Sequence, residues 1–291
     1  MEMADERLMK GDTIGFATEM RKLVNNKEFS DIKFLVGPNR KVIYAHKCIL
    51  SSRCMVFKAM FTDQASKSGG MDKDTQLPFP DMSPDVFLAV LEFIYSNTVT
   101  LRPKIAIETM ATALEYGLDD LRRVCVEYLV ESLTVMTACD CMQAAVMYEQ
   151  ELLKSKTLKF IEEHTQQVFS SKGFQELSDG SLIEVLKSDN LKLDEEEVQK
   201  YVKEWAHVNS VVQSKPPSEV AQRVVQWLRL PILTPQELEN LEKENKKDNI
   251  IPVECFSASW KFHALKQQDP NNPLAKKRSG TKPRDHHKNL C

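Results

Sequence analysis

The spacing of apolar residues changes once along this chain, and that change divides the fold into two dissimilar parts. In residues 31–44, apolar and polar residues alternate in two short runs, DIKFLV and KVIY, on either side of Gly37-Pro38-Asn39. Alternation on both sides of turn residues predicts a β-hairpin. Beyond residue 134, every periodic run has the i, i+3, i+4, i+7 spacing of an amphipathic helix. We therefore predict an α+β fold: short strands covered by helices, followed by an all-helical unit.

The length of the chain, 291 residues, suits two domains, because one domain usually holds about 100 to 200 residues. We place the α/β domain at residues 12–133 and the helical domain at residues 134–245. Two apolar stripes are typical of helices in the second domain, namely Val198, Tyr201, Val202 and Trp205, and Val220, Val224, Trp227 and Leu228. Ser214-Lys215-Pro216-Pro217 predicts a break between these two helices.

Segments outside these domains differ in composition. Residues 246–265 contain ECFSASWKFHAL, which is too aromatic to remain in water, so we expect this segment to dock on the helical domain. Residues 266–291 have almost no apolar content, and residues 1–11 are rich in both signs of charge. We expect both ends to be disordered. Within the first domain, the polar run SKSGGMDKD at residues 66–74 predicts a mobile loop.

The distribution of charge argues against a nucleic-acid partner. The chain has a net charge of −3, but residues 266–291 hold seven Lys or Arg against two Asp, a net +5 that leaves −8 on residues 1–265. Binding to phosphates needs a basic face, which an acidic body lacks. Lys276-Lys277-Arg278 is either a nuclear localisation signal or a solvated basic run, and we favour the solvated run.

Several features indicate an intracellular protein without membrane contact. The most apolar stretch, VFLAVLEFIY, is about half the length of a membrane span and contains Glu92. The first residues lack the apolar core of a secretory signal. Seven cysteines without a C-x-x-C pair are typical of reduced core thiols. We expect a cytoplasmic location, and a nuclear one as well if the basic run is a localisation signal.

Patterns typical of catalytic and metal sites are missing. The sequence contains no GxxxxGK[ST], GxGxxG, HExxH or GxSxG. No carboxylate or serine motif accompanies His46, so we interpret this histidine as structural. Cys139-Asp140-Cys141 lacks the second ligand pair that structural zinc needs. We predict a non-enzymatic protein with no catalytic, cofactor or metal site.

The order of these elements resembles a known family. FSDIKFLV, then VIYAHKCILSSRCMVFKAMF, then Asp-Met-Ser-Pro running through FLAVLEFIYSNTVTL are similar to the BTB (POZ) domain. EEEVQKYVKEWAHVN and WLRLPILTPQEL are similar to the BACK domain, with its acidic helix start, tryptophan and Arg-Leu-Pro ending. The match covers about residues 12–245. Because no kelch repeat follows Leu241, the chain resembles a short member of the BTB–BACK family.

The resemblance implies a protein that acts by binding other proteins and that forms homodimers. BTB domains usually pair through their N-terminal helix, often with exchange of a first strand, and symmetric pairing is the common form of homodimer. The interface residues expected on this basis are Phe16, Met20, Leu23, Val24, Ile32 and Phe34. The alternative is that the helix packs only on its own chain.

The resemblance also implies binding to cullin-3, a ubiquitin-ligase scaffold, through the helix that ends near Met60 and Phe61 and through Asp63 beyond it. Many cullin-3 adaptors carry a hydrophobic-x-Glu motif there, whereas this chain has Thr-Asp-Gln-Ala-Ser-Lys at residues 62–67. Two functions therefore stay open. One is a dimeric substrate adaptor of a cullin-3 ligase, and the other is a ligase-independent scaffold or transcriptional regulator. The sequence identifies no substrate.

A further resemblance concerns Asp31 and Lys47, which match a charged pocket near the dimer seam of some transcriptional BTB domains. This resemblance implies a groove for a corepressor. The alternative is local structure, because an aspartate at a strand start and a lysine at a helix start often only cap or face water. We favour local structure.

Overall fold

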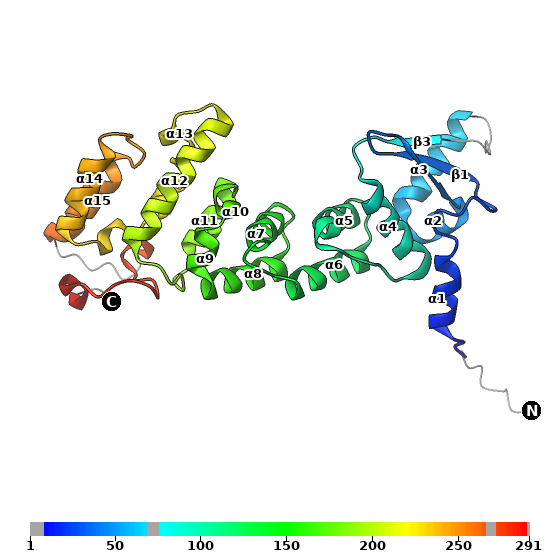
Figure 1. Ribbon diagram of the computed structural model, residues 1–291, viewed down its shortest axis with the longest axis horizontal. Helices are drawn as coiled ribbons and strands as arrows, with labels where there is room; N and C mark the ends of the chain where they lie inside the picture. The colour runs from blue at the N-terminus through cyan, green and yellow to red at the C-terminus, as the bar shows by residue number, and fades with distance from the viewer. Residues whose placement is uncertain (1–8, 69–75, 266–271, 290–291) are drawn as a thin grey trace, which may run out of the picture. The chain divides into compact units, whose positions relative to one another are not determined.

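The computed structural model describes residues 9–68, 76–265 and 272–289 (Figure 1). The chain divides after Ser132 into two compact units, and each is described by itself. Our expectations for residues 1–8, 69–74, 266–271 and 290–291 lie outside the described residues. Residues 66–68, which we assigned to a loop, continue a helix instead. No helix among the described residues has the length and apolar character needed to cross a membrane.

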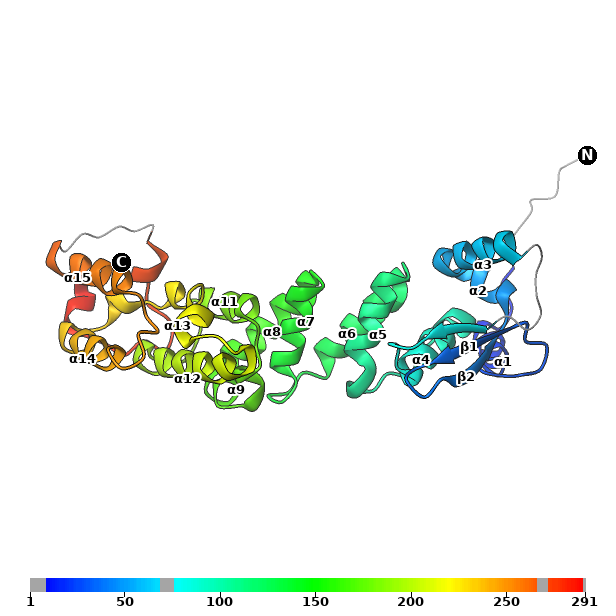
Figure 2. The same cartoon turned by 90° about the horizontal axis from the view of Figure 1, so that it is seen from above.

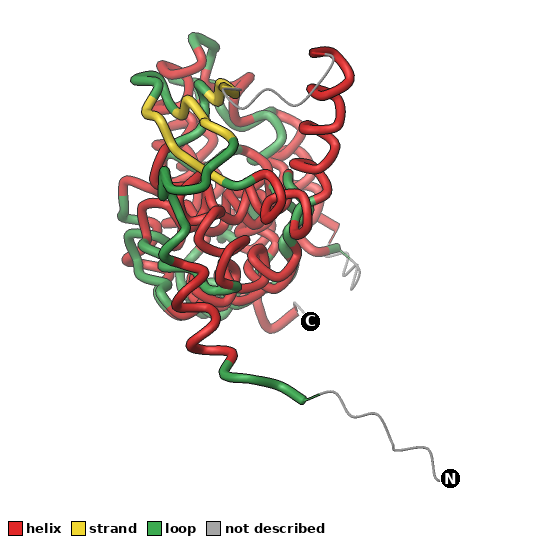
Figure 3. The backbone as a smooth tube through the Cα atoms, turned by 90° about the vertical axis from the view of Figure 1, so that its right-hand side faces the viewer, coloured by secondary structure: helices red, strands yellow, loops and turns green. Residues whose placement is uncertain are grey.

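The first unit is built on a three-stranded sheet in the order β2–β1–β3, drawn in yellow in Figure 3. β1 (Ile32–Val36) pairs antiparallel with β2 (Lys41–Ala45) and parallel with β3 (Gln76–Phe79). Gly37 has a φ of 75° in the turn after β1, a conformation that glycine adopts without strain. β1 and β2 form the predicted hairpin, and the α+β class is confirmed.

The described residues of the first unit also form six helices. They are α1 (Thr13–Arg21), α2 (Lys47–Arg53), α3 (Met55–Ser68), α4 (Pro84–Ser96), α5 (Pro103–Glu115) and α6 (Asp119–Glu131). Pro84 is the first residue of α4, where a missing N–H breaks no helical hydrogen bond. Three buried phenylalanines join sheet to helices: the Phe34 ring centroid lies 4.9 Å from Phe87 and 5.8 Å from Phe57.

The regular elements in the described residues of the second unit are all helices. Its α-helices are α7 (Ala138–Met147), α8 (Glu151–Glu163), α9 (Thr165–Phe169), α10 (Lys172–Gln175), α11 (Asp179–Lys187), α12 (Glu195–Gln213), α13 (Pro217–Ala221), α14 (Pro235–Asn245) and α15 (Val253–Leu265). α7 and α8 lie side by side (Figure 2). Trp205 of α12 is buried in the core, and its indole N–H donates to the Leu177 carbonyl at 2.8 Å. Phe256 of α15 belongs to the same core.

One helical stripe is less regular than its spacing suggests. We expected a single helix through Val220, Val224, Trp227 and Leu228. Instead α13 ends at Ala221, and a 3₁₀ turn, η1 (Val225–Trp227), follows. Val220, Val224 and Leu228 are still buried. A 3₁₀ turn places residues i and i+3 on one side, so spacing alone does not distinguish it from an α-helix.

The C-terminal segment, which we define as residues 272–289, corrects a second expectation. We expected residues 266–291 to be a disordered basic tail. The segment, red in Figure 1, instead forms two 3₁₀ turns, η3 (Pro273–Ala275) and η4 (Asp285–Asn289), and buries Arg278 in the second unit. The prediction of disorder from composition was wrong because ion pairs rather than apolar side chains hold this segment.

Candidate interaction surfaces

The first candidate surface lies on α1. The Asp12 carboxylate begins the helix by accepting the amides of Ile14 and Gly15, each at 3.0 Å. α1 packs on α4 and has no buried residue. The side chain of Phe16 is 65% exposed, and Met20 is half-buried. An apolar helix face that its own unit leaves uncovered is suited to a protein partner.

The other residues assigned to the dimer interface lie elsewhere. Leu23 and Val24 are half-buried in the turn after α1, which ends at Arg21. Ile32 and Phe34 are buried in the core of their own unit, so their assignment to an interface is wrong for this unit. Both lie on β1, the central strand, which β2 and β3 flank on either side. β1 itself therefore has no free edge on which a second chain could pair.

The second candidate surface is the exposed side of α3. Met55 is 72% exposed and Val56 is 36% exposed, and exposed Ala59 and Asp63 lie on the same side. Residues at i, i+1, i+4 and i+8 fall on one helix face. Met60 is half-buried at the border of this face. We name Met55, Val56, Ala59 and Asp63 the α3 face.

Phe61 does not contribute to the α3 face, which corrects its assignment as a cullin contact. Its side chain is buried against Phe57, with ring centroids 6.0 Å apart. The reason is helical phase: Phe57 and Phe61 lie at i and i+4, so both point to the core. Met55 and Val56 are not among the contacts predicted from the sequence, although the helical period places both opposite this pair.

The Asp31 and Lys47 pair has a structural role. The Asp31 carboxylate accepts the backbone N–H of Lys47 at 2.7 Å, at the first residue of α2. The preceding residue, His46, makes no side-chain cap of its own, so Asp31 satisfies a helix-terminal amide from outside the helix. This contact supports the local-structure alternative over a recognition pocket.

His46 is also tied into the fold. Its Nδ1 lies 2.9 Å from the Tyr95 hydroxyl and its Nε2 lies 3.1 Å from the Glu28 carbonyl oxygen. Burial raises the pKa of Tyr95 above its ordinary value, partly offset by the His46 backbone amide. Tyr95 therefore keeps its proton at neutral pH. Its hydroxyl contacts both the backbone N–H and the ring Nδ1 of His46. These contacts fit the structural interpretation.

The Cys139 and Cys141 thiols face the core of the second unit. Burial raises the pKa of Cys139 to about 11 and that of Cys141 to about 12, so both stay protonated at neutral pH, whereas metals bind the thiolate. In the part of the chain that the structure describes, no three His, Cys, Asp or Glu side chains are arranged to hold a metal ion.

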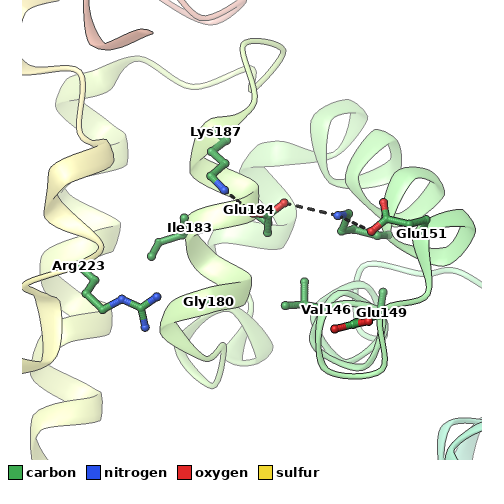
Figure 4. A pocket seen from close by; sticks show the side chains of 10 residues that line it. Val146, Glu149, Glu151, Gly180, Ile183, Glu184, Lys187 and Arg223 are labelled. Atoms are coloured by element: carbon green, nitrogen blue, oxygen red, sulfur yellow. Dashed lines mark hydrogen bonds and ion pairs between the residues drawn. The ribbon is translucent and has the colours of Figure 1, made fainter.

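A cleft of about 520 Å³ opens between α7, α8 and α11 (Figure 4). Its cations have carboxylate partners. Lys154 binds Glu151 at 2.8 Å, Lys187 binds Glu184 at 2.5 Å, and Arg223 binds an aspartate of α11 at 2.7 Å. Because these charges already neutralise one another, the cleft has no unpaired cation with which to attract an anionic ligand.

The third candidate surface holds the C-terminal segment. It consists of Asp189, Asp194, Glu195 and Glu237, which we name the acidic site. The Arg278 Nε donates to Glu195 at 3.0 Å, and neither side chain is exposed (0% each). The same guanidinium donates to the carbonyl oxygens of residues 186 and 188. A buried arginine is thus paired and hydrogen-bonded, as burial of a charge requires.

A second arginine of the segment, Arg284, binds two carboxylates. It donates to both oxygens of Asp194, at 2.8 and 2.9 Å, and to Glu237 at 2.7 Å. Burial alone would raise the pKa of Asp194, but hydrogen bonds from Arg284 and from backbone amides outweigh it and hold the pKa below its ordinary value. The two-pronged geometry is one that arginine offers and lysine does not.

The segment also binds through its backbone. The amide of Ser279 donates to the Asp189 carbonyl at 2.8 Å, and the amide of Gly280 donates to the Leu191 carbonyl at 2.9 Å. A Cβ on Gly280 would overlap the backbone at Leu193. Lys276 binds the Asp189 carboxylate as well. The chain at this point therefore needs a glycine, in addition to the two arginines.

Three histidines lie close together where η4 of the C-terminal segment meets α15. The His286 ring is 5.0 Å from His263 of α15 and 4.5 Å from His287, measured between centroids. His287 Nε2 lies 2.7 Å from the Ile232 carbonyl oxygen. Burial, together with the charges of the neighbouring histidines and of Arg284, lowers the pKa of His286 to about 4. His286 is therefore neutral while the segment is in place.

These two units and their exposed helix faces define a class of interaction modules. The BTB/POZ domain model matches residues 20–133, and the BACK model, described as BTB And C-terminal Kelch, matches residues 138–243. The chain belongs to the BTB–BACK family. The acidic site lies within the BACK match, whereas the C-terminal segment lies beyond it.

Similar proteins extend the match to almost the whole chain. BTB/POZ domain-containing protein 19 of Bos taurus is 37% identical over 284 residues, which cover 97% of this chain and 96% of that one. The Homo sapiens protein of the same name is 37% identical over 288 residues. BTB/POZ domain-containing protein 9 of Drosophila melanogaster is 31% identical over 77% of this chain but only 29% of its own length.

Proposed function

We propose that this protein is a non-enzymatic, homodimeric adaptor that binds the cullin-3 scaffold through the α3 face and presents a protein substrate to the ligase. The observation that carries the proposal is the exposure of Met55 and Val56 on α3 of a BTB domain. Apolar residues on an exposed helix face lose water contact when a partner helix covers them. Membership of the BTB–BACK family supports the same proposal.

The dimeric part of the proposal rests on α1. A face that includes Phe16 and Met20 and is left uncovered by its own unit would be buried in a symmetric contact with a second copy. The same proposal places the protein in the cytoplasm. While the C-terminal segment is in place, Arg278 is buried and Lys276 is paired, so the basic run is not free to serve as a nuclear localisation signal.

One observation favours the second candidate function, a scaffold that works without a ligase. Asp63 occupies the end of the α3 face, where the family resemblance implies a hydrophobic-x-Glu motif, and no glutamate is present there. The side chain of aspartate is one methylene shorter than that of glutamate. The carboxylate of Asp63 would therefore lie farther from a partner group that a glutamate at this position would contact. The adaptor proposal therefore depends on the apolar part of the α3 face.

A binding assay with the cullin-3 N-terminal domain tests the proposal. The wild-type chain should be retained at micromolar concentration. Met55→Arg should weaken retention at least about tenfold, because a charge is costly in the desolvated centre of an interface. Val211→Arg is the matched control, since Val211 is 80% exposed at the end of α12. A wild-type chain that is not retained would refute the adaptor and leave the scaffold.

A further inference from the structure

The C-terminal segment binds the acidic site in the manner of a peptide ligand. In residues 276–287 the buried side chains are polar: Arg278 and His287 are buried, while the proline of this stretch is exposed. The contacts are ion pairs and backbone hydrogen bonds. Each such bond contributes little net free energy, because water offers the same bonds to a released segment. Apolar burial in the segment is limited to Ala275, so it contributes little to fixing the segment in place.

The contacts define a short recognition pattern. Position 278 requires arginine, because one planar guanidinium binds Glu195 and two carbonyl oxygens together. Position 280 requires glycine, because any side chain would meet the backbone at Leu193. Position 284 requires arginine, which binds Asp194 through two hydrogen bonds. The pattern is Arg-x-Gly-x-x-x-Arg.

We propose that the acidic site is a peptide-binding site for Arg-x-Gly-x-x-x-Arg segments and that the chain's own segment occupies it in competition with a partner protein. The partner is an extended basic segment with the same two arginines and glycine. This inference goes beyond the adaptor function, since it requires neither cullin-3 nor dimerisation. It gives this chain, whose sequence contains no kelch repeats, a defined site for binding another protein.

Covalent attachment explains why the chain's own segment prevails at rest. The segment follows α15 after residues 266–271, so its effective concentration at the acidic site is on the order of millimolar. A separate peptide at micromolar concentration competes poorly with it. A partner succeeds if it binds elsewhere on the protein as well, or if the segment is weakened.

A binding experiment on the full-length chain tests this proposal. The variant Arg278→Ala with Arg284→Ala leaves the acidic site intact and weakens its own segment. A fluorescent peptide with the sequence of residues 272–289 should bind this variant at least about tenfold more tightly than wild type, because the internal competitor is lost. A peptide with lysine at both arginine positions should bind the variant at least about tenfold more weakly. Adding Glu195→Gln to the variant should remove binding.

Two results would overturn the proposal. One is a folded double variant, judged by circular dichroism and cooperative unfolding, that does not bind the peptide. The other is measured on wild type and needs no folded variant: the amides of Ser279 and Gly280 should exchange with solvent at least about 100-fold faster than the amide of buried Trp205, because only local opening is needed. Equal exchange rates would make the segment a fixed part of the fold.

Discussion

Glu195→Gln should destabilise the second unit by about 1–3 kcal/mol. In wild type, Glu195 accepts the Arg229 amide at 2.6 Å with one oxygen and the Arg278 Nε–H at 3.0 Å with the other. A glutamine oxygen can still accept the Arg229 amide, but its NH₂ group then faces the N–H of Arg278. A buried guanidinium left without its counter-charge costs about 3–5 kcal/mol. The expected loss is smaller because the C-terminal segment can leave, which returns Arg278 to water.

Tryptophan fluorescence measures this loss in the second unit alone, because all three tryptophans, Trp205, Trp227 and Trp260, lie in it. A loss of 1–3 kcal/mol should lower the unfolding midpoint by about 2–12 °C in a unit of this size. Arg278→Ala should cost a similar amount, and the double variant should cost no more than the larger single loss, since both changes release the same segment. Losses that add to within about 0.5 kcal/mol would refute this reasoning.

Three further predictions concern α1 and the segment. Phe16→Asp should convert the dimer to a monomer by light scattering, whereas Thr18→Asp, on the opposite side of α1, should not; a dimeric Phe16→Asp variant would refute the α1 interface. Because the pKa of His286 is about 4 in the folded unit but about 6.5 when unfolded, stability present above pH 6.5 should be lost as pH falls toward 4. His286→Asn should flatten this slope in thermal unfolding, and an unchanged slope would contradict the assignment. Ser279→Asp should increase binding of the 272–289 peptide, because a second negative charge beside Asp189 weakens the segment; unchanged binding would count against this.

Local sequence patterns predicted the elements whose cause is local. Alternation around Gly37 predicted the β1–β2 hairpin, and Ser214-Lys215-Pro216-Pro217 predicted the break between α12 and α13. The BTB–BACK assignment followed from the order of such elements. These predictions succeed because turn conformation, helix capping and amphipathic period each depend on residues within one or two turns of the chain.

The errors concern features that depend on distant residues. β1 is a central strand only because β3 joins it from more than 40 residues away, so local spacing does not show that Ile32, placed in an interface by the family resemblance, is buried in its own unit. Arg278 pairs with Glu195, which lies 83 residues earlier in the chain. A prediction based on apolar content does not take such an ion pair into account. A usable signal was present: the acidic start of α12 and the Arg-x-Gly-x-x-x-Arg pattern are opposite in charge, which would have suggested a contact.

The assembly of the full-length chain with the cullin-3 N-terminal domain tests the central claim most directly. Size-exclusion chromatography with light scattering should give the chain alone a mass of twice 33.3 kDa. The mixture should give one peak containing two copies of each protein, and Met55→Arg should return the two proteins to separate peaks. A chain of 33.3 kDa would contradict dimerisation, and separate peaks for wild type at micromolar concentration would contradict the adaptor function.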